Sequence, residues 1–133
     1  MNAMRKQSGF TTIELIIAIL FLCAVGGLFM IQKNETDALA RDTARKTAIN
    51  AMYYNLEEVY YPTQKSYPRV LSASNLKAMD SKLLKDPQGV VIGDQGSDYR
   101  YEPTGCNGEA CSGYTLRTGL EKERDFIKQT PTE

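Results

Sequence analysis

Apolar residues are concentrated near the start of the chain. Leu15–Ile31 is a run of seventeen residues without a charge, and it extends back to Phe10 with interruptions only at Thr11, Thr12 and Glu14. As an α-helix, the stretch from residue 10 to residue 31 is roughly 33 Å long, which is about the hydrocarbon thickness of a bilayer. A buried core helix is the alternative, but about a hundred mostly polar residues cannot surround it. The pattern therefore predicts a membrane-spanning helix over residues 10–31.

Positive charges flank this predicted span unequally. Arg5 and Lys6 precede it, and Lys33 follows it. Basic residues are enriched on the cytoplasmic side of membrane spans. We therefore expect a single-pass protein of the cytoplasmic (inner) membrane with its N-terminus in the cytoplasm.

The segment that follows is also helical in pattern. Residues 35–61 contain no proline or glycine, and Ile49, Met52, Leu56 and Val59 recur at helical spacing. The simplest prediction is one helix from about Phe10 to Tyr61, roughly 78 Å long. Asp37 with Arg41, and Asp42 with Arg45 and Lys46, are expected to form pairs on its exposed face.

The C-terminal half has a different pattern. We expect a short helix capped by Ser74 or Asn75, with Leu76, Met79 and Leu83 on one face, that ends at Asp86-Pro87. Seven of the ten glycines fall between residues 89 and 119. There the alternation around 99–101 and 114–116 predicts two strands joined by a Gly-rich connection, with a third strand near 126–127. The predicted fold class is α+β, a long helix packed on a small antiparallel sheet.

Composition excludes several classes of function. The 133-residue chain has sixteen basic and sixteen acidic residues, so no nucleic-acid site is evident, and it has no histidine for Ser-His-Asp catalysis or for a His-ligated metal. The eight tyrosines are interpreted as core residues rather than as a ligand platform. We do not expect an enzyme.

Cysteine spacing bears on the compartment. Cys106 and Cys111 bracket a turn between two predicted strands, and a hairpin would bring them together. A disulfide there would contribute roughly 2 kcal/mol to stability in the chain-entropy model. A zinc half-site is the rival interpretation, but neither a histidine nor a second close cysteine pair is present. Cys23 is interpreted as a small apolar residue of the span.

Glu14 is the anomaly of the apolar segment. A carboxylate in a membrane-spanning helix costs on the order of 2–3 kcal/mol and usually marks function. Its neighbours one turn away, Phe10 and Ala18, are apolar. The sequence therefore predicts that Glu14 has a partner outside its own helix.

The opening residues resemble a known family. Arg5-Lys6-Gln7-Ser8-Gly9 followed by Phe10-Thr11-Thr12-Ile13-Glu14-Leu15 closely resembles the signal of type IV pilin-like proteins. The resemblance implies a leader (1–9), a transmembrane and assembly helix (10–31) and an extracytoplasmic pilin-like domain (32–133) that includes the amphipathic helix 35–61. It further implies that a prepilin peptidase cuts between Gly9 and Phe10 and methylates Phe10, and that Glu14 meets the Phe10 amine of a neighbouring subunit.

The family implies a structural function. The chain would lie in membrane lipid and then join copies of itself and related pilins in an extracellular or periplasmic filament, built by pilus or secretion assembly machinery. Two departures from many pilins leave a type II secretion pseudopilin open as the alternative. The predicted span lacks a proline, and the two paired cysteines enclose a short loop.

Other interpretations remain weaker. Ala24-Val25-Gly26 is a passable cleavage site for an ordinary signal-anchored or secreted binding domain, and cleavage before Cys23 would give a lipoprotein. No cofactor is expected, although calcium is an alternative because related pseudopilins bind it in this part of the chain. The acidic residues that could supply a calcium site or an exported enzyme's carboxylates are Asp80, Asp86, Asp94, Asp98 and Glu102.

Overall fold

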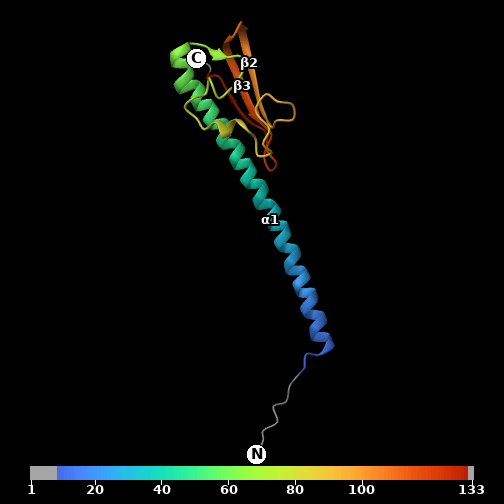
Figure 1. The fold of residues 1–133 in the computed structure, drawn as a ribbon. Coiled ribbons are helices and arrows are strands. Elements are labelled where there is room, and N and C mark those ends of the chain that lie inside the picture. The colour runs from blue at the N-terminus through green and yellow to red at the C-terminus, as the bar shows by residue number, and fades with distance from the viewer. Residues whose placement is uncertain (1–8, 132–133) are drawn as a thin grey trace, which may run out of the picture. The chain divides into compact units, whose positions relative to one another are not determined.

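A long helix dominates the N-terminal half of the computed structural model, which describes residues 9–131 (Figure 1). Helix α1 spans Thr12–Tyr54, continues as a π-helical segment, η1 (Asn55–Tyr60), and ends as α2 (Tyr61–Gln64). Pro62, which has no N–H to donate, lies in this last segment directly after η1. The predicted long helix is confirmed, with both ends slightly later in the chain than expected. Arg5, Lys6 and the rest of the expected leader before Gly9 lie outside the described residues.

The described residues fall into two compact units. One ends at Asp37, and the other begins at Ala38, so α1 contributes to both. The first unit consists of the apolar part of α1 and the residues before it. The second contains the rest of α1 and every other helix and strand described.

Antiparallel strands form the sheet of the second unit. They are β1 (Tyr67–Pro68), β2 (Tyr99–Asn107), β3 (Ala110–Thr118) and β4 (Phe126–Gln129). β3 is central, with β2 on one side and both β1 and β4 on the other. The predicted hairpin and third strand are confirmed. β1 was not predicted, because a two-residue strand that contains proline has no detectable alternation.

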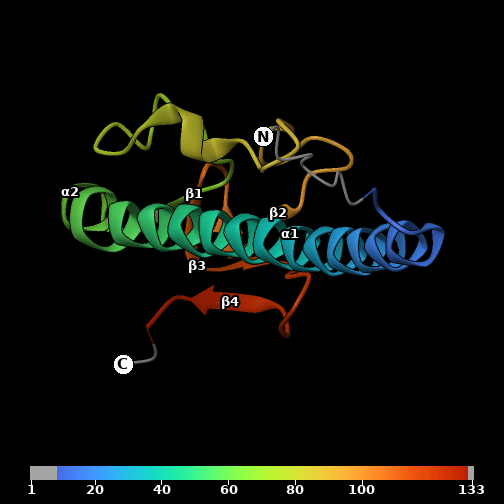
Figure 2. The same cartoon turned by 90° about the horizontal axis from the view of Figure 1, so that it is seen from below.

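The core lies between α1 and this sheet. Ile49, Met52 and Leu56 are fully buried and belong to one cluster with Tyr114 and Leu116 of β3. The segment between β1 and β2 and the strand β4 lie on opposite sides of the helix (Figure 2). The fold class is therefore α+β, as predicted.

Val59 does not continue the buried stripe. It is 37% exposed, whereas the three predicted stripe residues before it are fully buried. Val59 lies in η1, where hydrogen bonds run from i to i+5 and each turn holds more residues than in an α-helix. A residue three positions after Leu56 therefore no longer faces the sheet.

The predicted short helix after residue 74 is wrong. Turns occupy this region, and only a 3₁₀ segment, η2 (Ser81–Leu84), is helical. The Asn75 side chain accepts a hydrogen bond from the Ser72 N–H and donates one to the Val70 carbonyl, which closes a turn instead of capping a helix. With its amide oxygen facing this loop, buried Asn55 accepts hydrogen bonds from the N–H groups of Ala78 and Met79. Side-chain hydrogen bonds thus replace the helical ones.

The β2–β3 hairpin carries the predicted disulfide. Cys106 and Cys111 face each other in the strand register and are bonded. Gly108 turns the chain with φ +63°, a conformation that residues with a side chain rarely adopt. At Gly105, the Ser112 side chain occupies the space that a Cβ would need. The hairpin tip therefore depends on both glycines as well as on the disulfide.

Candidate functional site

The expected processing site lies just before α1. Gly9, Phe10 and Thr11 are not helical, and Phe10 is 88% exposed. A Cβ added at Gly9 would meet nothing within 4 Å. The peptide bond between Gly9 and Phe10 is therefore accessible and lies outside the hydrogen-bonded helix, as a protease substrate needs.

Glu14 has a partner within its own chain. Its Oε2 atom accepts hydrogen bonds from the Thr11 N–H (2.9 Å) and the Thr11 hydroxyl (3.0 Å), while the Glu14 N–H donates to that hydroxyl oxygen (3.4 Å). This is a capping box, in which the residue before the helix and the third helical residue satisfy each other's backbone N–H groups. The expectation that its helix offers no partner is thus corrected. The Thr-x-x-Glu spacing at the start of an apolar run was the sequence signal for it.

The surface of α1 after this cap is apolar on all sides. The large hydrophobic side chains between residues 13 and 31 are each about half to two-thirds exposed. Free Cys23 is also exposed. A helix that is apolar all round requires a nonaqueous environment or protein partners. This helix is long and apolar enough to span a membrane.

Gly26 and Gly27 interrupt this surface with two positions that lack a side chain. A Cβ at either glycine would meet nothing within 4 Å. Both remain helical despite the low helix propensity of glycine. The predicted membrane-spanning helix is therefore continuous through the two glycines.

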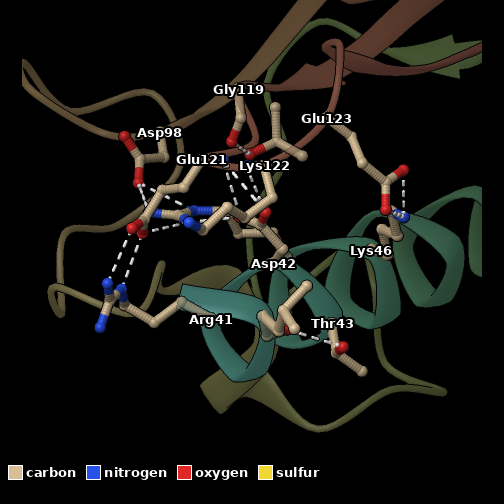
Figure 3. Close-up of polar contacts among 12 residues, drawn as sticks. Arg41, Asp42, Thr43, Lys46, Asp98, Gly119, Glu121, Lys122 and Glu123 are labelled. Carbon is tan, nitrogen blue, oxygen red and sulfur yellow. Dashed lines mark hydrogen bonds and ion pairs between the residues drawn. The ribbon is translucent and has the colours of Figure 1, made fainter. Parts of the chain in front are cut away.

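In the second unit, a buried ion cluster connects α1 to the loop of residues 119–124, which lies between β3 and β4 (Figure 3). Arg45 is 3% exposed and pairs with Asp42 (2.9 Å), Asp98 (2.8 Å) and Glu121 (2.9 Å). Asp42 also accepts hydrogen bonds from the N–H groups of Glu121 and Lys122. One guanidinium group therefore connects three carboxylates from three segments of the chain.

Neighbouring pairs extend this cluster towards solvent. Arg41 forms a two-pronged hydrogen bond with Glu121, at 2.7 Å for each contact, and Lys46 pairs with Glu123 at 2.7 Å. The sequence predicted that Asp42 pairs with Arg45 and Lys46 on the exposed face of the helix, and it did not predict Glu121 or Glu123 as partners. The close pair is confirmed, but its exposure is wrong, because the loop 119–124 covers it.

The electrostatics follow from these contacts. Burial alone would raise the pKa of Asp42, but hydrogen bonds from the Glu121 and Lys122 backbone and from Arg45 outweigh burial and lower it. Hydrogen bonds from Arg41 and Arg45 lower the pKa of Glu121 to about 2. Burial lowers the pKa of Arg45, but its carboxylate partners outweigh burial and raise it overall. These contacts therefore keep Asp42, Arg45 and Glu121 charged at neutral pH.

Four of the five acidic residues named for calcium have other partners, and Asp98 is already paired with Arg45. Asp80 caps η2, and buried Asp86 accepts hydrogen bonds from the N–H groups of Gln88, Val90 and Asp98. Glu102 pairs with Arg117 on the sheet. Within residues 9–131, no group of three or more Cys, Asp and Glu side chains is arranged to hold a metal ion.

Comparison with known proteins adds nothing to this geometry: no protein-family model, curated protein or solved structure matches the chain.

Proposed function

We propose that this chain is a structural subunit of a type IV pilus-like filament. It is made as a single-pass membrane precursor, cleaved between Gly9 and Phe10, methylated at Phe10, and assembled through its N-terminal helix. The observation that carries the proposal is the register of four features, which are basic residues, the Gly9-Phe10 junction, Glu14 and an uncharged run of seventeen residues.

Exposure of the N-terminal segment supports this assignment. Gly9 and Phe10 are accessible, and the apolar surface of α1 over residues 13–31 has no partner among the described residues. Lipid can cover this face before assembly, and neighbouring helices can cover it afterwards. A filament therefore accounts for a surface that a soluble monomer would not keep exposed.

Glu14 supports the proposal through its charge. Cleavage after Gly9 creates an ammonium group at Phe10, one helical turn before Glu14. Two opposite charges that are each costly in an apolar medium become favourable when paired between subunits. The Thr11 contacts use only one of the two carboxylate oxygens, Oε2, so Oε1 remains available for the amine.

The same machinery makes pseudopilins of type II secretion systems, which are the second candidate. The six-residue ring closed by Cys106 and Cys111 is the specific observation in its favour, because many pilins have a much longer C-terminal disulfide loop. The two functions differ in where the filament is found, outside the cell or within the envelope.

Mass spectrometry of the mature protein tests the proposal. We expect an N-terminus at Phe10 that carries one added methyl group, and we expect Gly9→Arg to retain the leader. Gly27→Ala, which introduces a side chain into open space, is the control and should be processed normally. A mature N-terminus at Cys23 or Gly27 would show a different class of exported protein.

A further inference from the structure

Glu57 is a half-buried carboxylate held by two tyrosines. Its Oε1 atom accepts a hydrogen bond from the Tyr114 hydroxyl (2.6 Å), and its Oε2 atom accepts one from the Tyr67 hydroxyl (3.1 Å). Burial and the contact with Glu57 raise the pKa of both tyrosines, so both hydroxyls remain protonated donors at neutral pH. The carboxylate is therefore fixed in position.

This carboxylate forms no ion pair in the described part of the chain. None of the ion pairs among residues 9–131 includes Glu57. The Lys65 ammonium lies over the Tyr61 ring, 5.9 Å from the ring centroid, and the Lys128 ammonium lies over the Tyr53 ring, 5.3 Å from its centroid. A carboxylate that is partly removed from water is most stable when a cation pairs with it.

Glu57 also lines a recess of about 380 Å³ in the second unit. The other lining residues are Tyr61, Tyr67, Ser112, Thr130 and Pro131, none of them basic. Together with Glu57, they come from η1, α2, β1, β3 and the segment after β4, so the recess exists only when the second unit is folded.

The polar atoms of this recess mainly need donors. The Ser112 hydroxyl donates to the Thr104 carbonyl and keeps its lone pairs unused. The Thr130 hydroxyl donates to the Tyr114 carbonyl and accepts a hydrogen bond from the Tyr114 N–H (2.7 Å), so it keeps one unused lone pair. Each oxygen of Glu57 likewise accepts only one hydrogen bond and has further capacity. A primary ammonium group offers three N–H donors and a positive charge.

From this combination we infer that the recess formed by Glu57, Ser112 and Thr130 binds a primary alkylammonium group. The ammonium donates to the Glu57 carboxylate and to the two hydroxyl oxygens. Its alkyl stem contacts Tyr61 and Pro131. The group is a free amine or the side chain of a lysine from a second copy of the chain. This site belongs to the second unit alone and does not depend on the proposed function.

Titration with n-butylammonium chloride tests the site. The full chain is kept in a non-ionic detergent at constant ionic strength, and the amide resonances of Ser112 and Thr130 are followed by NMR. We expect saturable shifts with a Kd in the millimolar range. Tetramethylammonium, which has the same charge but no N–H donor, should not saturate these shifts.

Two matched variants decide which carboxylate is responsible. Glu57→Gln keeps an acceptor for the tyrosines but removes the charge, and it should weaken butylammonium binding about tenfold. Glu58→Gln makes the same change at the adjacent, exposed position and should change the Kd less than about twofold. Absence of saturable shifts, equal binding by Glu57→Gln, or equal binding of tetramethylammonium would overturn the inference.

Carbodiimide coupling of concentrated protein then identifies the source of the ammonium. Dimers linked through Glu57 and a lysine, absent in Glu57→Gln, would show that a second copy supplies it. Butylammonium binding without such dimers would show that the site takes a free amine. Both outcomes support the ammonium site.

Discussion

Glu14 combines a backbone cap with a charge at the first turn of α1. Its contacts with Thr11 complete the helix start, which needs an acceptor for the Thr11 N–H but no net charge. The proposed assembly contact with a neighbouring amine needs the charge. These two functions can be separated, because glutamine also serves as the last residue of a capping box.

Glu14→Gln should therefore be cleaved and methylated like the wild type but enter filaments poorly. In the filament this variant would leave a buried ammonium group without its anion. The contact between subunits would then be weaker by about 3–5 kcal/mol. Thr11→Val is the matched control, since it removes the hydroxyl cap at a cost of about 0.5–2 kcal/mol and keeps the charge. The measurement compares processed protein in membranes with protein in sheared filaments. Normal filament yield from processed Glu14→Gln would mean that the carboxylate acts only as a cap.

Arg45 is the residue whose ion pairs should contribute most to the stability of the second unit. Arg45→Met removes the shared partner of three carboxylates and leaves Asp42, which is 3% exposed, without its cation. Breaking such a pair by removing one member costs about 3–5 kcal/mol. Arg41→Met removes a half-exposed partner of Glu121 and should cost less than about 1 kcal/mol. Urea unfolding of the full chain in detergent, followed by tyrosine near-UV circular dichroism, measures the free energy of unfolding of both variants. Equal decreases in the two variants would show that the burial of Arg45 does not increase its contribution to stability.

The disulfide hairpin is the element whose contribution is most easily isolated. Cys106→Ser opens the ring between β2 and β3 and should lower the free energy of unfolding by about 2 kcal/mol, because the unfolded chain is no longer constrained. Cys23→Ser, which alters a free and exposed thiol, is the control and should leave the free energy of unfolding unchanged. Thiol labelling that finds Cys106 and Cys111 both free in exported protein would contradict the pairing.

Elements with strong periodic patterns were predictable from the sequence, and those defined by side-chain hydrogen bonds were not. The stripe of Ile49 and Met52 and the tyrosine alternation each fix one element through burial, and the uncharged run forms its helix without burial. Residues 72–84 carried an equally plausible helical pattern, yet Asn75 and Asn55 bond to the backbone there. Nothing local in the sequence reveals that Asn55 reaches this loop.

The same limit applies to the sites. Gly9, Phe10 and Glu14 lie within six consecutive residues, so their spacing could be recognised directly in the sequence. The contacts of Arg45 with Asp98 and Glu121 join residues 53 and 76 positions apart. Only the fold brings such residues together, and the i,i+3 spacing of Asp42 and Arg45 could not show that a loop would bury them.

The two units of the chain differ in whether their hydrophobic side chains are buried. In the second unit, apolar side chains of α1 face the sheet and are buried, whereas in the first unit they are exposed on every side. The second unit thus completes its core within one chain, and the first does not. A protein with this distribution requires lipid or other chains for one part of its length only.

Folding of the second unit should depend on pH at both extremes. The pKa of Glu121 is lowered from 4.5 to about 2, and those of Asp42 and Asp86 are lowered from 3.8. A carboxyl group with a lowered pKa in the folded state contributes stability above its ordinary pKa and loses it as the pH falls towards the folded value. At high pH, burial raises the pKa of Tyr99 to about 12, so its contribution is lost as the pH rises from 10 towards that value.

We therefore expect a plateau of thermal stability between about pH 5 and pH 10, with the melting temperature of the full chain in detergent falling from about pH 4.5 to pH 2. Glu121→Gln removes the most strongly shifted carboxyl group, so its melting temperature should be lower at neutral pH and should fall less in acid. Glu123→Gln, which removes a carboxylate from the same loop, is the control and should retain the acid dependence of the wild type. Tyrosine near-UV circular dichroism during heating measures all three proteins across the pH range. An acid dependence in Glu121→Gln as steep as that of the wild type would show that the contacts of Glu121 with Arg41 and Arg45 do not control the acid stability of the folded unit.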